Sequence, residues 1–180
     1  MLNADLAVVE AIAEAEELVA DKFWRAAYDR AVPALTVLVR NLNPAGHDYF
    51  IVNFRKQDLS TGRMVVNRLT GVVEVATGVE IEGEALPEFI APTEVGRRLK
   101  EAEVVLEDGR IVHLPSGAPT IVVLWQHCRE SQTMLQPFYW LQWSTLGLFL
   151  RTDGRFFDRL TPTDGMPIRV AFSSGRSRGV

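Results

Sequence analysis

Cysteine is almost absent from this chain, since Cys128 is the single one among 180 residues. A lone cysteine excludes an intrachain disulfide and a metal site built from several thiolates. Histidine is scarce too, and His47, His113 and His127 lie far apart in the sequence. Glycine-rich phosphate loops and the H-E-x-x-H zinc motif are missing as well. The sequence therefore predicts no cofactor and no metal, and it favours binding over catalysis.

Long apolar runs and an excess of positive charge are also missing. The longest apolar run, residues 121–125, has the length of a strand and not of a membrane span. The first residues carry no basic segment, so we expect neither a signal peptide nor an anchor, and a cytoplasmic location. With 19 basic and 23 acidic residues the net charge is −4, which does not favour nucleic acid or an anionic membrane as partner.

Helical periodicity dominates the first part of the chain. Apolar residues recur at steps of three and four, and they predict a helix over residues 4–31 that is capped by Asn3. We expect Leu6 and Val9 to begin its buried face and the glutamates to line the opposite, solvated face. Such a helix would be about 42 Å long, so we expect a bend near Asp21.

After this helix the apolar period changes to two, which is typical of strands. Acidic, proline-marked residues 80–92 form the expected connection between two halves, and a short helix is expected over residues 93–100. Turn signals such as Thr70-Gly71, Asp108-Gly109 and Asp153-Gly154 join the strands into hairpins. Strands are expected over residues 35–40, 49–56, 63–68, 72–77, 104–107, 110–113, 120–126, 137–143, 146–151, 155–158 and 168–172.

These elements predict an α+β fold in which a long N-terminal helix packs on a curled antiparallel sheet. Residues 1–82 would form the first half and residues 83–180 the second, with fusion into one compact domain left open. Residues 49–54 match residues 138–143 position by position, at an offset of 89. We interpret this similarity as a degenerate duplication of one helix-and-sheet unit.

The strand over residues 48–52 and the following hairpin, Val66-Asn67-Arg68-Leu69-Thr70-Gly71-Val72-Val73, carry a resemblance to a known family. They are similar to the "y-x-V" strand and "V-n-x-x-T-G-x-V" hairpin of PepSY-type, cystatin-like repeats. Residues 137–140 and 153–156 repeat the pattern in the second half. The resemblance implies small non-catalytic modules that are often associated with peptidases and that inhibit or regulate them.

Chemistry could come from Cys128, which lies next to His127 and close to Glu130. A thiolate assisted by an imidazole would be a nucleophile. Neighbouring side chains on a strand point to opposite faces, however, so His127 is poorly placed to assist Cys128. We expect a non-enzymatic protein and keep as an alternative a small-ligand or thiol-dependent module with a cavity near Cys128.

Binding residues are expected among the aromatic and basic side chains. Tyr139, Trp140 and Trp143 lie in one strand, and tyrosine and tryptophan are favoured interface anchors. Arg55 and Arg68 belong to a set of strand arginines that could receive an acidic peptide. The leading prediction is a binding or regulatory, inhibitor-like protein that engages a protein or peptide partner by a sheet edge or an aromatic face.

Charge distribution adds a further alternative. Residues 1–30 have a net charge of −4 and residues 151–180 a net charge of +3. An acidic helix could neutralise one partner in the manner of an immunity protein, and the two ends of the chain could attract each other within or between molecules. Self-association is therefore also left open.

Overall fold

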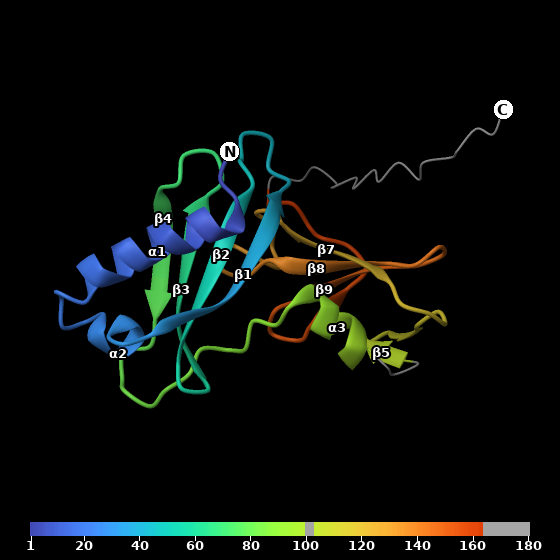
Figure 1. Ribbon diagram of the computed structural model, residues 1–180. Helices are drawn as coiled ribbons and strands as arrows, with labels where there is room; N and C mark the ends of the chain where they lie inside the picture. The colour runs from blue at the N-terminus through green and yellow to red at the C-terminus, as the bar shows by residue number, and fades with distance from the viewer. Residues whose placement is uncertain (100–102, 164–180) are drawn as a thin grey trace.

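The computed structural model describes residues 1–99 and 103–163, and these form an α+β fold (Figure 1). The elements are, in order, α1 Ala4–Leu18, α2 Arg25–Tyr28, β1 Val32–Asn41, β2 Tyr49–Lys56, β3 Leu59–Asn67, β4 Val73–Gly78, α3 Pro92–Arg98, β5 Glu103–Val105, β6 Ile111–His113, β7 Thr120–Trp125, β8 Phe138–Gln142, β9 Gly147–Arg151 and β10 Phe156–Phe157.

Within these residues, eight strands form one sheet in the order β10-β9-β8-β7-β1-β2-β3-β4, and β5 and β6 pair separately. Each half is an antiparallel meander, as predicted. The halves meet where β1 and β7 pair in parallel, with Arg40 opposite Leu124 and Asn41 opposite Trp125. The sheet is therefore mixed. It contains strands from both predicted halves, residues 1–82 and residues 83–180. The predicted short helix is present as α3 and contacts β7, but the duplication of one unit stays a prediction.

The N-terminal helix begins as predicted but ends early. Asn3 caps it, and its side-chain Oδ1 accepts a hydrogen bond of 2.9 Å from the Leu6 N–H. The prediction that it continues to residue 31 was wrong, because α1 ends at Leu18 and only the short α2 follows. Helical structure is interrupted where the bend was expected, between α1 and α2. The Asp21 carboxylate there accepts a hydrogen bond from the Phe23 N–H.

The two faces of the first meander are covered by different parts of the chain. α1 crosses one face, where its alanines lie on the side chains of β2 and β3 (Figure 1). Residues 79–91, which we call the connecting segment, lead to α3. Phe89 of this segment and Val95 of α3 cover the other face of the meander. This second core continues along β7 and β8, so it joins the two halves of the sheet. The predicted strand at residues 168–172 lies outside the described residues.

Candidate functional site

α1 turns its small residues inward and its large apolar residues outward. Ala7, Ala11 and Ala15 are buried against the sheet. The prediction that Leu6 and Val9 lie on the buried face was wrong, since they are 52% and 59% exposed. Ile12 is also exposed, at 37%. We call Leu6, Val9, Ile12 and the adjoining Glu10, Glu16 and Glu17 the outer face of α1.

The size of the residues beneath α1 explains this inversion. The sheet surface under the helix already carries Phe50, Phe54 and Met64, and the ring of Tyr28 stands edge-on to Phe54 at 5.2 Å. Alanines at positions i, i+4 and i+8 share one side of a helix, and they allow the helix axis to come close to these large side chains. The large side chains of the sheet already fill the space between the sheet and α1. The larger aliphatic residues of α1 therefore lie on its opposite, exposed side.

The acidic residues of α1 have no ion-pair partner among the residues that the structure describes. The helix carries five carboxylates and no basic residue, and none of the five takes part in an ion pair within the described part of the chain. Because α1 ends at Leu18, Glu16 and Glu17 lie in its last turn and not in the first half of a longer helix. Negative charge at the C-terminal end opposes the helix dipole, at about 0.3–1 kcal/mol for each charge.

More exposed apolar surface lies beside the start of α1. The turn between β3 and β4 is tied to the N-terminus by a hydrogen bond of 2.9 Å from the Leu2 N–H to the Arg68 carbonyl. Leu69 and Val72 in this turn are both more than half exposed. Leu2 and Glu10 pack over Gly71 between them, and the φ of +81° at Gly71 confirms the predicted glycine turn. Apolar surface thus borders α1 on this side.

The predicted aromatic candidates lie in the packed part of the sheet. Tyr139 is buried and donates a hydrogen bond of 2.6 Å to the Ile90 carbonyl. Trp143 is also buried, and its Nε1 donates to the Gly117 carbonyl at 3.0 Å. Trp140 is half-buried with its ring centre 4.4 Å from that of Phe149. Their contacts are those of core residues, and a role in partner binding stays a prediction.

The two predicted arginines are not brought together. Arg68 pairs with Asp48 at 3.2 Å, next to the start of β2. Arg55 lies near the other end of that strand, where its nearest carboxylate belongs to Glu88 of the connecting segment. Sequence reasoning did not single out Glu88, because nothing in its local sequence indicates that it meets a strand more than 30 residues earlier.

Cys128 is fully enclosed. Burial raises the pKa of its thiol to about 11, so the thiol is protonated at neutral pH. The nearest polar contact of the His127 ring is the Thr163 hydroxyl at 3.5 Å, and Glu130 accepts a hydrogen bond from the Thr161 N–H. The Glu130 side chain also acts on the Cys128 thiol and raises its pKa further, whereas no hydrogen bond joins the His127 ring to this thiol in the described residues. A thiol-dependent reaction at Cys128 stays a prediction.

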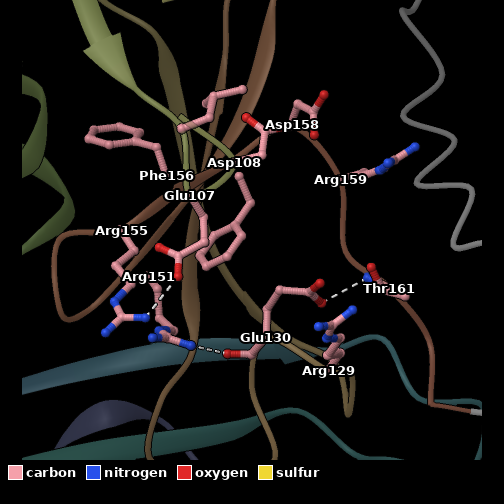
Figure 2. Close-up of a pocket in the computed structure, with 12 residues that line it drawn as sticks. Glu107, Asp108, Arg129, Glu130, Arg151, Arg155, Phe156, Asp158, Arg159 and Thr161 are labelled. Carbon is pink, nitrogen blue, oxygen red and sulfur yellow. Dashed lines mark hydrogen bonds and ion pairs between the residues drawn. The ribbon is translucent and has the colours of Figure 1, made fainter. Parts of the chain in front are cut away.

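A pocket of about 420 Å³ opens beside this cysteine, between the β9–β10 hairpin and residues 106–108 and 129–130 (Figure 2). Its charged walls are largely neutralised by one another. Arg151 binds Asp153 through both Nε and Nη2, and Arg155 binds Glu107 at 2.9 Å. Glu130 lines the pocket and Cys128 does not, and a ligand cavity that serves Cys128 stays a prediction.

In the described residues, no three His, Cys, Asp or Glu side chains gather closely enough to hold a metal ion. None of the helices there has the length and the apolar character needed to span a membrane. No family model matches the sequence, no curated protein matches it, and no solved structure matches the fold. The similarity to PepSY-type repeats accordingly stays a prediction.

Proposed function

We propose that this protein is a non-enzymatic binding protein that docks a protein partner on the outer face of α1 and regulates or neutralises it. The observation that carries the proposal is the inverted burial of α1, with alanines against the sheet and Leu6, Val9 and Ile12 in solvent. Local rules are broken mainly where function requires it, and α1 breaks two of them, in its burial and in its charge.

The composition of this face defines the chemistry of the partner. Apolar side chains at i, i+3 and i+6 form one stripe; Glu10 and Glu17 lie along one side of it, and Glu16 lies at its C-terminal end. A complementary surface offers an apolar groove with lysine or arginine at its rim. A second copy of the chain is a poor match, because two such helices face to face would bring like charges together.

Strand addition at β4 is the second candidate function. β4 forms one edge of the sheet, while the other edge strand, β10, is bridged by Leu106 at Phe156. An extended peptide could therefore pair with the outer side of β4 through backbone hydrogen bonds. α1 passes over β4, so the two surfaces adjoin (Figure 1).

The test replaces Leu6, Val9 and Ile12 together by glutamine, which has a helix propensity similar to that of leucine. A photo-crosslinking residue at the exposed Ala13 identifies the partner in cells, and the affinity of the purified partner is then measured. We expect binding to weaken at least about 100-fold, because central apolar anchors dominate interface energies. Partner binding that survives the triple substitution overturns the proposal.

The matched control replaces Val32, Val105 and Ile111, which are similarly exposed on other elements, by glutamine. This variant should bind the partner normally. Salt separates the two candidate functions, since affinity for the acidic face should fall as NaCl rises from 0.05 to 0.5 M, whereas backbone pairing at β4 should change little. Crosslinks that form at β4 and not at Ala13 would favour strand addition.

A further inference from the structure

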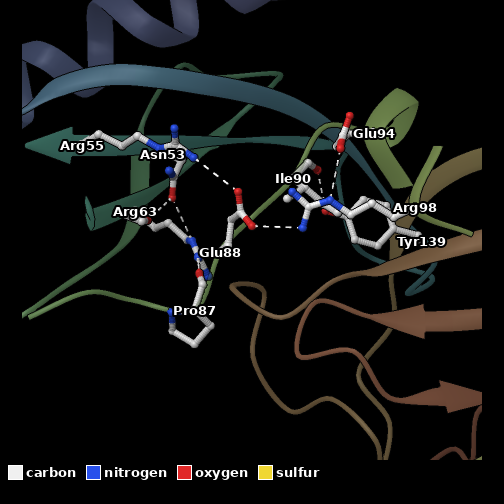
Figure 3. A network of polar contacts seen from close by, with 10 residues as sticks. Asn53, Arg55, Arg63, Pro87, Glu88, Ile90, Glu94, Arg98 and Tyr139 are labelled. Atoms are coloured by element: carbon white, nitrogen blue, oxygen red, sulfur yellow. Dashed lines mark hydrogen bonds and ion pairs between the residues drawn. The ribbon is translucent and has the colours of Figure 1, made fainter. Parts of the chain in front are cut away.

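Three arginines from different elements converge on the connecting segment, across the sheet from α1 (Figure 3). Arg98 of α3 binds one carboxylate oxygen of Glu88 at 3.2 Å, and Arg55 of β2 lies 3.7 Å from the other oxygen. Arg63 of β3 lies beneath them and donates to the Pro87 carbonyl, one residue before Glu88. The Glu88 carboxylate is thus placed between the guanidinium groups of Arg55 and Arg98, and the guanidinium of Arg63 holds the preceding residue.

Arg63 has no carboxylate partner among the residues that the structure describes. It is only 6% exposed, its Nε donates to the Asn53 Oδ1 at 3.1 Å, and its guanidinium lies over the ring of Phe89. A buried arginine is ordinarily paired with an acid, because an uncompensated charge in the interior is destabilising. Its burial lowers the pKa of this guanidinium, which reflects the same unfavourable position.

Hydrogen-bond donors at this place exceed the acceptors. The Nδ2 of Asn53, a fully buried residue, and the Nε of Arg55 are both buried without an acceptor in the described chain. The contact of Arg55 with Glu88 is too long for a hydrogen bond. Since buried donors are nearly always paired, the cluster lacks at least one acceptor.

We call Arg55, Arg63, Arg98 and Asn53 the arginine cluster. We propose that Arg55 and Arg98 of this cluster bind the oxyanion group of a ligand at the place that the Glu88 carboxylate now occupies, while Arg63 adds positive charge beside them. The ligand chemistry is a phosphate or carboxylate group, which matches the planar donors of arginine. Glu88 is an internal occupant that the ligand displaces. This site is independent of the outer face of α1, which lies on the other side of the sheet.

Access to the cluster requires little rearrangement. The Glu88 side chain is half exposed, and those of Arg55 and Arg98 are similarly open to solvent. The backbone on either side of Glu88 is held by hydrogen bonds to the carbonyls of Pro87 and Ile90. Rotation of the Glu88 side chain therefore exposes Arg55 and the Nη1 of Arg98 without moving the connecting segment, while the Nε of Arg98 stays bound to Glu94 at 3.2 Å.

The test is a titration with inorganic phosphate at constant ionic strength, followed by calorimetry and by amide NMR shifts near the cluster. We expect saturable binding by the natural sequence and binding that is at least about fivefold tighter in Glu88→Gln, because the internal competitor is gone. Arg55→Gln and Arg98→Gln should each weaken binding by at least about fivefold. Arg63 is left intact, because its replacement would disturb the core.

Arg97→Gln is the matched control, since Arg97 lies on the same helix, is well exposed, and pairs with Glu94 but not with Glu88 among the described residues. It should bind phosphate as the natural sequence does. Acetate distinguishes the two sources of the oxyanion, because it should compete with phosphate if the site takes carboxylates and should not if it takes phosphoryl groups. Non-saturable binding, or equal losses in the Arg97 and Arg98 variants, overturns the proposal. Weaker binding by Glu88→Gln overturns it as well.

Discussion

α1 and the connecting segment cover opposite faces of the same four strands by opposite means. α1 brings alanines to the sheet and leaves leucine, valine and isoleucine outside. The connecting segment with α3 does the reverse, since Phe89 and Val95 are almost wholly buried and its charged residues face outward. The connecting segment with α3 follows the usual rule that large apolar side chains are buried, whereas α1 does not. The proposed docking of a partner on α1 depends on this difference.

Charge pairing separates the two coverings in the same way. Glu82, Glu88 and Glu94 of the segment and α3 each bind a basic side chain of the protein. The five acids of α1 bind none in the described chain. Acids that are paired internally stabilise the fold weakly, whereas unpaired acids beside apolar residues suit a basic partner.

The largest effect is expected where the connecting segment is anchored. Phe89→Ala removes a ring that contacts Tyr139 and Arg63, and it leaves a cavity in the core shared by both halves. We expect the free energy of unfolding to fall by about 3–5 kcal/mol, measured by urea denaturation. A loss below about 1 kcal/mol would mean that the segment does not pack as a core element.

Enlarging the inner side of α1 should have the next largest effect. Ala11→Leu places a large side chain where the helix touches the sheet, and we expect a destabilisation of about 1–3 kcal/mol. Ala13→Leu, on the exposed side of the same helix, is the control and should change stability little. Equal effects at the two positions would contradict the inverted packing of α1.

A buried tyrosine hydroxyl also holds α2 against the sheet, and another holds the connecting segment against it. Tyr139 donates to the carbonyl of Ile90, and Tyr28 donates to the carbonyls of Arg63 and Thr77. Tyr139→Phe and Tyr28→Phe should each cost about 1 kcal/mol at pH 7, measured by urea denaturation.

Burial raises the pKa of Tyr139 from 10.0 to about 12. The unfolded chain therefore loses this proton first, and the stability that it contributes is present below pH 10 and is lost as the pH rises to 12. Urea midpoints measured across this window should fall less steeply in Tyr139→Phe than in the natural sequence. An unchanged slope would show that the hydroxyl is not buried in solution.

The smallest effect concerns the charges of α1. Glu17→Lys removes an unfavourable charge at the C-terminal end and should raise stability by about 0.5 kcal/mol, while Asp5→Asn in the first turn should lower it by a similar amount. Thermal denaturation at low salt measures both. Glu17→Lys should also weaken partner binding. Changes of the same sign in the two variants would exclude the dipole argument.

Much of the fold was predictable because its signals are local. Asn3 begins the first helix, and hairpins form at Gly71, Gly109 and Gly154, each with a positive φ. The end of α1 was not predictable, because no proline or glycine marks residues 19–24. The buried side of α1 was misjudged because aliphatic residues surround the helix and only the volume of the sheet beneath decides between its sides.

The candidate sites were less predictable than the fold. Arg63 is another of the strand arginines, and it is buried because the connecting segment returns over β3. Arg55 was predicted to receive an acidic peptide, and that stays a prediction; in the structure it lies near Glu88 of the same chain. Contacts between residues that are far apart in the sequence depend on tertiary packing, and they leave no periodic pattern in the sequence.

The parallel joint between β1 and β7 has a consequence for the order of folding. It links the meanders through Arg40 and Leu124, residues whose positions differ by 84, and its strand register comprises two residue pairs, followed by a hydrogen bond from the Leu42 N–H to the Trp125 carbonyl. Closing so long a loop is slow compared with forming either set of hairpins. We expect the two meanders to form first and to dock last, so that changes at this joint accelerate unfolding and leave the refolding rate nearly unaltered.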